Sequence, residues 1–345
     1  MSAIQPPSKI LFTGANGYFA TYAIKDLLER GYTVVGTVRS TSKGEELLKL
    51  HDRFGGQFSY VVVPDIVQAG AFDEVIKQGK FDGVAHAASP VVAGSTPDDY
   101  IRPAVDGTVG ILASIRQYGP TIKRVVLTSS ALAAMQYQGV SLHTEAHWNE
   151  ASIKIVEEKG LEASGGELYT ASKTYAEKAA WKFVKDNKGA IGFDLVAILP
   201  SYILGAPIHP VSSREQLTST NMVFSVVRNA RPDSELGNTA FHMVHARDMA
   251  ILHSASFGVV EASGHRIFGI GSEPTWQNIY NALNEDPAFP NVPKGSPSAG
   301  THADSGSKDW DVSFPKKLLG REFIGAKQAF RETEEYYQRK GWAFQ

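Results

Sequence analysis

The sequence predicts an α/β fold: a doubly wound parallel sheet with helices on both faces and a smaller C-terminal α/β lobe. Short β-branched runs alternate with helical segments in the first part of the chain, and a glycine-containing turn joins the first run to the first helix. Apolar strands separated by helices are typical of parallel sheets buried on both faces. After Pro200 the alternation weakens and proline becomes frequent. We therefore expect one domain at 1–200 and a smaller lobe at 201–345.

Each strand is predicted from a short apolar run, and each helix from the amphipathic segment that follows it. Predicted strands cover residues 9–13, 32–39, 58–63, 83–86, 124–129 and 194–199. Predicted helices cover residues 19–31, 43–50, 69–79, 97–118 and 167–187. The C-terminal part is expected to hold helices at 216–229, 246–258, 274–284 and 326–340, with a strand at 265–270. Some of these later segments should return to the first domain, so the boundary is discontinuous.

Composition excludes several kinds of site. The 34 basic and 36 acidic residues give a net charge of −2, and no block of like charge occurs, so nucleic acid and anionic membranes are not expected partners. The absence of cysteine excludes disulfides, thiolate catalysis and iron–sulfur clusters. No apolar run is long enough to span a bilayer, and the start lacks a secretory-signal pattern. We expect a cytoplasmic protein that is a monomer or a homodimer.

The turn TGANGYFA, residues 13–20, follows the first predicted strand and opens the first predicted helix. Gly14 permits a tight turn, Gly17 lets a pyrophosphate approach the helix N-terminus, and Ala20 allows close packing. The alternative is a structural turn that only needs positive φ angles. Because a strand precedes the turn and a helix follows it, the turn predicts a dinucleotide cofactor. The other turn residues expected at this cofactor are Asn16, Tyr18 and Phe19.

The end of the second predicted strand, GTVRS, indicates which dinucleotide binds. An NAD site usually has a carboxylate there for the ribose hydroxyls, and this strand has none. Arg39 and Lys43 suit a 2′-phosphate instead, so NADP is favoured; the alternative is that both are ordinary surface charges. After the third strand, Asp65 could accept a hydrogen bond from the adenine amine while Ile66 packs on the ring. A helix cap is the alternative role for Asp65.

The helix predicted at 167–187 contains two tyrosine–lysine pairs. Tyr169 and Lys173 are four residues apart, and Tyr175 and Lys178 are three apart. Both spacings place the two side chains on one helical face, so spacing alone does not distinguish a proton-transfer pair from an ordinary surface pair.

Eight motifs, in order, resemble the extended short-chain dehydrogenases/reductases, in the branch of dihydroflavonol reductase and the fungal aldehyde and ketone (methylglyoxal-type) reductases. They are TGANGYFA, VRSTSK, VVVPDI, HAASPV, VVLTSSA, YTASK, ILPSYILG and MVHARDMA, and they cover nearly the whole chain. The resemblance implies a Rossmann fold, NADPH/NADP as cofactor, a small-molecule carbonyl substrate and a substrate-binding C-terminal lobe.

The residues that the family uses in catalysis fall on Ser130, Tyr169 and Lys173. The resemblance implies that Tyr169 donates a proton, that Lys173 lowers its pKa and holds the nicotinamide ribose, and that Ser130 binds the carbonyl oxygen. Tyr175 has no lysine four residues later, so Tyr169 is the expected acid. The resemblance also places Ala87, Pro200, Ile203 and Ser219 at the cofactor, and Ser89, Pro90, Val91 and Tyr202 at the substrate. For Tyr202 and Ile203 the alternative is a place in the hydrophobic core.

The predicted activity is NADPH-dependent reduction of an aldehyde or ketone to an alcohol. The alternatives are NADP-dependent oxidation of an alcohol or hydroxysteroid, a nucleotide-sugar epimerase or dehydratase, which would prefer NAD, and a non-catalytic NADP-sensing protein. No metal site is expected. His143 and His147 have helical-turn spacing, and His242 and His245 flank a short apolar strand, but no metal-binding signature accompanies either pair.

Overall fold

The computed structural model describes residues 3–89, 94–136 and 139–342. Its centre is a seven-stranded sheet in the order β3-β2-β1-β4-β5-β6-β9, in which every neighbouring pair is parallel. The strands are β1 (Lys9–Thr13), β2 (Thr33–Val38), β3 (Phe58–Val62), β4 (Gly83–His86), β5 (Arg124–Thr128), β6 (Asp194–Pro200) and β9 (Arg266–Gly269). The predicted doubly wound parallel sheet is confirmed, with strand order reversing between β1 and β4.

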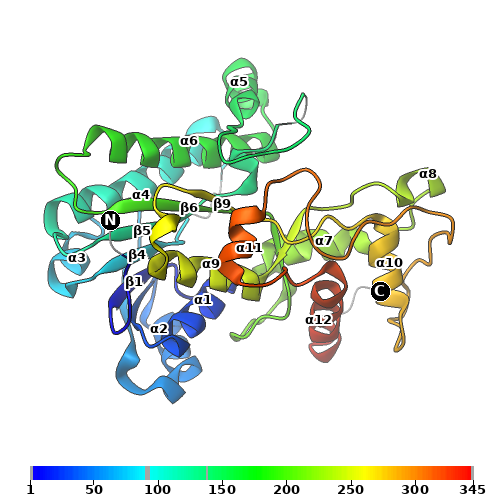
Figure 1. Cartoon of the computed structure of the whole chain (residues 1–345), viewed down its shortest axis with the longest axis horizontal. Coiled ribbons are helices and arrows are strands. Elements are labelled where there is room, and N and C mark those ends of the chain that lie inside the picture. The colour runs from blue at the N-terminus through cyan, green and yellow to red at the C-terminus, as the bar shows by residue number, and fades with distance from the viewer. Residues whose placement is uncertain (1–2, 90–93, 137–138, 343–345) are drawn as a thin grey trace.

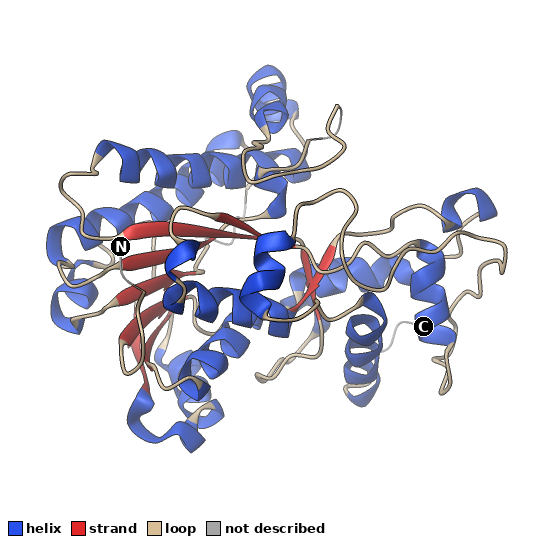
Figure 2. Ribbon diagram, viewed as in Figure 1, coloured by secondary structure: helices blue, strands red, loops and turns tan. Residues whose placement is uncertain are grey.

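Helices cover both faces of this sheet (Figures 1 and 2). One face carries α3 (Asp73–Gly79), α4 (Pro97–Tyr118) and α6 (Gly165–Asp186). The other carries α1 (Tyr18–Glu29) and α9 (Ala246–Gly258), while α2 (Thr41–Leu50) packs on β2 and β3. Two apolar cores result, one on each side, because the buried strands supply aliphatic side chains to both faces.

The start of α6 is fixed by its own sequence. Ser164 Oγ accepts a hydrogen bond from Glu167 N at 3.3 Å, and the Glu167 carboxylate accepts one from Ser164 N at 2.8 Å. This reciprocal cap satisfies backbone donors that a helix N-terminus leaves unpaired. It therefore fixes the first turn of the helix that carries Tyr169 and Lys173. The helix at 97–118 is confirmed with its predicted bounds.

The C-terminal part contains a further apolar core around a two-stranded parallel sheet. Its elements are β7 (Tyr202–Leu204), β8 (Met243–His245), α7 (Thr218–Val227), α8 (Asp233–Leu236), α10 (Trp276–Asn284) and α12 (Ala326–Arg339). In contrast, α9 and β9 pack with the large sheet, although they follow residue 201 in the chain. The division at residue 200 stays a prediction.

Four elements were not predicted: α5 (Glu150–Lys159), β7, α8 and α11 (Ser313–Leu319). The last three have three to seven residues, which is too short to give a clear hydrophobic period. Helix α3 begins at Asp73 rather than near 69, because residues just before it form hydrogen-bonded turns. No helix in the described part of the chain has the length and apolar sequence needed to cross a membrane.

Candidate active site

A cavity of about 490 Å³ lies where several strands of the large sheet end. In open parallel sheets, ligands bind at this edge near the point where strand order reverses. Nine residues predicted at the cofactor or the substrate line it: Gly14, Asn16, Gly17, Tyr18, Arg39, Lys43, Ile66, Ala87 and Ser89. The C-terminal part adds His209, Pro210, Gln216 and Thr218, which sequence reasoning did not identify.

The turn after β1 allows a ligand to approach the protein backbone closely. Gly14 has φ +67°, and a Cβ atom there would lie 2.9 Å from Ala88 Cα, so only glycine fits. Gly14 N donates to Thr37 Oγ1 at 3.3 Å, and Gly17 N donates to Gly14 O at 2.9 Å. Gly17 is the N-terminal cap of α1, where free backbone N–H groups and the helix dipole favour a phosphate. This cradle fits the pyrophosphate of a dinucleotide.

Arg39 and Lys43 line the same cavity but differ in their partners. Lys43 Nζ lies 2.8 Å from Glu46 Oε2, so its charge is partly compensated. Arg39 is exposed, and its guanidinium makes no hydrogen bond or ion pair with any residue that the structure describes. Arg39 is therefore the cation best placed to bind an added phosphate. Asp65 accepts a hydrogen bond from Val67 N at 2.9 Å and does not line the cavity.

The predicted tyrosine–lysine pair lies beside Ser89. Lys173 Nζ donates to Ser89 Oγ at 3.0 Å and lies 5.7 Å from the centre of the Tyr169 ring. Tyr169 is 43% exposed, in contrast to the buried Ser130. Ser130 is buried at the end of β5, where its Oγ accepts from Leu132 N at 3.2 Å. The short helical turn that Ser130 caps packs against α6, the helix that carries Tyr169 and Lys173.

A buried ion pair, which the sequence did not reveal, joins α6 to the ends of β5 and β9. Glu177, one turn after Lys173, accepts from Ser129 Oγ at 2.7 Å and from Arg266 Nε at 2.6 Å. Trp181 Nε1 donates to the same carboxylate at 3.1 Å. These bonds fix the helix that carries Lys173 relative to the strand that precedes Ser130. Glu177 and Arg266 are 89 residues apart, and no local pattern links them.

Thr13 and His86 fix the chain after β4. Thr13 Oγ1 accepts from Ala87 N at 3.1 Å and from Ala88 N at 3.0 Å, so its own proton goes to His86 Nδ1, 2.9 Å away. Burial, together with the Lys173 charge, lowers the pKa of His86 to about 3, so the ring is neutral and carries its proton on Nε2. This arrangement positions the segment that leads to Ser89. No sequence pattern pointed to this role of Thr13, because a threonine at the end of a strand is common.

Two predicted cofactor residues lie away from the cavity wall. Phe19 packs against His253, with ring centres 4.9 Å apart. Ser219 Oγ donates to Ile203 O at 3.3 Å, and the neighbouring Thr218 lines the cavity instead.

The other predicted residues lie near the start of the C-terminal part. Pro200 ends β6, and Ile203 and Tyr202 belong to β7. The Tyr202 ring packs edge-on against Phe241, with centres 5.7 Å apart. Pro90 and Val91 lie outside the described residues.

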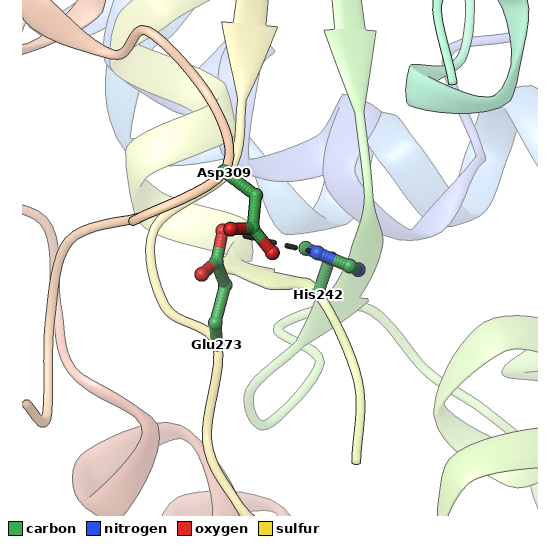
Figure 3. Close-up of side chains that lie close together, drawn as sticks. All are labelled: His242, Glu273 and Asp309. Carbon is green, nitrogen blue, oxygen red and sulfur yellow. Dashed lines mark ion pairs between the residues drawn. The ribbon is translucent and has the colours of Figure 1, made fainter. Parts of the chain in front are cut away.

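Three potential metal-ligating side chains gather near β8: His242, Glu273 and Asp309 (Figure 3). His242 Nε2 lies 3.8 Å from Glu273 Oε1. The buried Glu273 carboxylate already accepts hydrogen bonds from Ser307 Oγ and from Lys308 N, the latter at 3.1 Å. These two hydrogen bonds attach the segment just before Trp310 to Glu273. We therefore assign Glu273 a structural role.

Comparison with known proteins identifies the family. Residues 10–271 match the model of the NAD dependent epimerase/dehydratase family. The chain is 33% identical over 338 residues to a putative NADPH-dependent methylglyoxal reductase of Candida albicans, covering 94% of this chain and 96% of the relative. It is 36% identical over 294 residues to aldehyde reductase 2 of Sporidiobolus salmonicolor, covering 82% and 83%.

Solved structures agree with these sequence matches. Yeast methylglyoxal/isovaleraldehyde reductase complexed with NADPH superimposes with a TM-score of 0.82 at 31% identity, covering 97% of this chain and 99% of that one. A UDP-glucuronic acid 4-epimerase of Bacillus cereus shares the fold, with a TM-score of 0.63 at 14% identity. The family match, the reductase relatives and the arrangement of cavity and tyrosine–lysine pair agree: this chain belongs to the NAD dependent epimerase/dehydratase family, the extended short-chain dehydrogenases/reductases.

Proposed function

We propose that this protein reduces a small or medium-sized aldehyde or ketone to an alcohol with NADPH. The observation that carries the proposal is that Lys173, which lies beside Tyr169, donates to Ser89 in the wall of the cavity that also presents the Gly14 turn and Arg39. The names of the relatives support it, since both curated relatives described above are called reductases of aldehydes or methylglyoxal.

The residues around the cavity fit NADPH. The Gly14 turn and the N-terminus of α1 would hold the pyrophosphate, and Arg39 would bind the 2′-phosphate as a planar donor of several hydrogen bonds. Ile66 lines the cavity and would pack against the adenine ring. When bound, NADPH supplies the hydride that adds to the carbonyl carbon.

The chain's own residues would manage the charge that develops on the carbonyl oxygen. Ser130 Oγ donates a hydrogen bond to this oxygen, which stabilises the developing negative charge. Tyr169 Oη then gives its proton to the oxygen and completes the alcohol. The Lys173 ammonium carries a positive charge beside the phenol, which favours loss of that proton. Its hydrogen bond to Ser89 holds the ammonium in this position.

A nucleotide-sugar epimerase is the second candidate, because the fold is shared with such enzymes. A specific feature disfavours it: the end of β2 has Thr37 and Arg39 lining the cavity, where binding of NAD would need a carboxylate for the ribose hydroxyls.

The proposal is tested by following oxidation of NADPH with a panel of aldehydes, α-ketoesters, diketones and aryl ketones. We expect turnover with NADPH, weaker turnover with NADH, and a loss of about 10²- to 10⁴-fold in kcat for Tyr169→Phe without loss of NADPH binding. The control is Tyr175→Phe, which removes a hydroxyl that donates to the exposed Glu157 at 3.0 Å and should keep full activity. An active Tyr169→Phe enzyme, or NADPH binding without reduction of any carbonyl, would contradict the proposal.

A further inference from the structure

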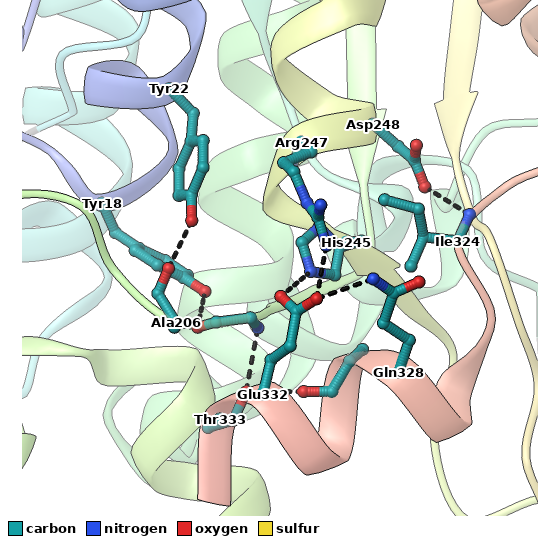
Figure 4. Close-up of polar contacts among 12 residues, drawn as sticks. Tyr18, Tyr22, Ala206, His245, Arg247, Asp248, Ile324, Gln328, Glu332 and Thr333 are labelled. Atoms are coloured by element: carbon teal, nitrogen blue, oxygen red, sulfur yellow. Dashed lines mark hydrogen bonds and ion pairs between the residues drawn. The ribbon is translucent and has the colours of Figure 1, made fainter. Parts of the chain in front are cut away.

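One wall of the cofactor cavity comes from the C-terminal part of the chain. Four residues after β7 line the same cavity as the Gly14 turn and Arg39: His209, Pro210, Gln216 and Thr218. They follow Gly205 and Ala206, which lie between α1 and α12 (Figure 4). The position of this wall therefore depends on how the Gly205–Ala206 pair is held.

Two tyrosines on successive turns of α1 hold the pair from one side. Tyr18 Oη donates to Gly205 O, and Tyr22 Oη donates to Ala206 O at 2.5 Å. Burial raises the pKa of Tyr22 to about 12, and that of Tyr18 well above its usual value, so both phenols remain donors at neutral pH. Thr21 extends the contact, since its Oγ1 lies 3.5 Å from His209 Nδ1.

Helix α12 holds the same pair from the opposite side. Gly205 N donates to the buried Thr333 Oγ1 at 3.0 Å. Gly205 has φ +124°, and a Cβ atom there would lie 2.8 Å from His245 Nε2, so the backbone is closely surrounded as well as hydrogen-bonded. Figure 4 shows Tyr22 and Thr333 approaching this segment from different helices.

We infer that Tyr22 and Thr333 are positioning residues for the cofactor: they hold Gly205 and Ala206, and through them the wall residues from His209 to Thr218, against bound NADPH. Neither side chain lines the cavity, whereas Tyr18 does. The inference rests on the proposed function, because it takes NADPH to be the occupant of the cavity.

The physical basis is a population effect. A cofactor binds at full affinity only to molecules whose wall is in place, so the apparent Kd rises in inverse proportion to the fraction of molecules with the wall in place. Loss of one buried hydrogen bond changes the ratio of displaced to in-place wall by about three- to tenfold, which is the upper limit of the rise in Kd. The reacting groups at Ser130 and Tyr169 are not altered, so turnover at saturating cofactor should be preserved.

The experiment compares Tyr22→Phe, Thr333→Val and the double variant. NADPH binding is measured directly by the fluorescence of the reduced nicotinamide, and KM for NADPH and kcat are measured alongside. We expect each single variant to raise Kd and KM by up to about tenfold, with kcat within about twofold of the parent. The double variant should bind NADPH more weakly than either single variant. Its rise in Kd should differ from the product of the two single rises, because both hydrogen bonds hold one segment.

Two further variants separate positioning from a general loss of structure. Thr333→Ser keeps the hydroxyl that accepts from Gly205 N and should restore parental affinity. Tyr175→Phe removes a surface hydroxyl and should leave Kd unchanged. Parental Kd in both Tyr22→Phe and Thr333→Val, or a fall in kcat with Kd unchanged, would overturn the inference. If the parent chain binds no NADPH, it is instead the proposed function that fails.

Discussion

The two sides of the cofactor cavity are built differently. The side formed by the large sheet rests on continuous parallel pairing, in which backbone groups of seven strands satisfy one another. The side formed after β7 rests on single side chains that bond to backbone atoms, as Tyr22 and Thr333 do. A sheet distributes its stability over many backbone hydrogen bonds, whereas a side-chain hydrogen bond of this kind is lost when one hydroxyl is removed. The wall formed after β7 is therefore more easily altered by a single substitution than the side formed by the large sheet.

The buried ion pairs also differ between the large sheet and the C-terminal core. In the sheet, Arg124 binds Asp194 with two parallel bonds of 2.7 and 2.8 Å, and donates to Ser256 O and Val259 O at 2.6 Å. In the C-terminal core, Arg228 pairs with Glu334, but among the described residues Arg228 Nε and Glu334 Oε2 have no partner. Burial raises the pKa of Glu334, so its charged form is poorly stabilised there.

The largest effect is expected from Arg124→Met. It would leave Asp194 buried and unpaired, which costs about 3–5 kcal/mol in free energy of unfolding. Arg228→Met should cost less, because Glu334 can take up a proton when its partner is removed. Urea unfolding at neutral pH measures both.

Lys182→Met is the matched control, since Lys182 pairs with Asp186 on the surface and should change stability by less than about 1 kcal/mol. Equal losses of unfolding free energy in the Arg124 and Arg228 variants would contradict the expected difference between the large sheet and the C-terminal core.

An effect of intermediate size, on cofactor preference, should distinguish the sheet side of the cavity from the wall formed after β7. Arg39→Ala removes the guanidinium proposed to bind the 2′-phosphate, so the preference for NADPH over NADH should fall about 10- to 100-fold, through KM for NADPH. Loosening the wall with Tyr22→Phe should instead weaken binding of both cofactors by a similar factor. Steady-state kinetics with each cofactor measures the ratio. An unchanged ratio in Arg39→Ala would show that Lys43 or another cation binds the phosphate.

The sequence predicted the sheet side well for a physical reason. Its strands are buried on both faces, so each is a continuous apolar run, and the Gly14 turn is a local signal that needs no distant partner. Seven of the nine predicted cavity-lining residues could be named in this way, whereas Ala87 and Ser89 came from the family resemblance. The placement of Tyr169 and Lys173 in one helix followed from their spacing, but the choice between the two tyrosine–lysine pairs came from the family resemblance.

The wall could not be predicted, because its residues meet through contacts that are distant in the chain. Thr333 is 128 residues from Gly205. On the sheet side, the Glu177–Arg266 pair was missed for the same reason, since its partners are 89 residues apart. The wall residue His209 has no motif of its own. Pairs of this kind are determined by tertiary packing, and a single sequence records neither partner's position.

The smallest effect tests how α12 is attached beside the wall. Glu332 of α12 lies 3.1 Å from His245 Nε2 and 2.5 Å from Arg247 Nη2 (Figure 4). Partial burial raises its pKa, but hydrogen bonds from His245 and Gln328 and the nearby positive charges outweigh burial and lower the pKa of Glu332 to about 2. An unfolded glutamate has a pKa of about 4.3, so the folded state binds the proton less readily. The stabilisation is therefore complete above about pH 5 and is lost as the pH falls toward about 2.

Glu332→Gln removes this charge and should lower the free energy of unfolding by about 1 kcal/mol at neutral pH, because the group is only partly buried. The difference between parent and variant should stay constant from about pH 6 to 8 and shrink as the pH is lowered from about 5 to 3. Urea unfolding at several pH values measures it, with Glu158→Gln, in a 3.7 Å pair with Lys154 on the surface, as the control. A difference that stays the same down to about pH 3 would mean that the carboxylate charge does not hold α12 and that the attachment beside the wall depends on packing and on Thr333.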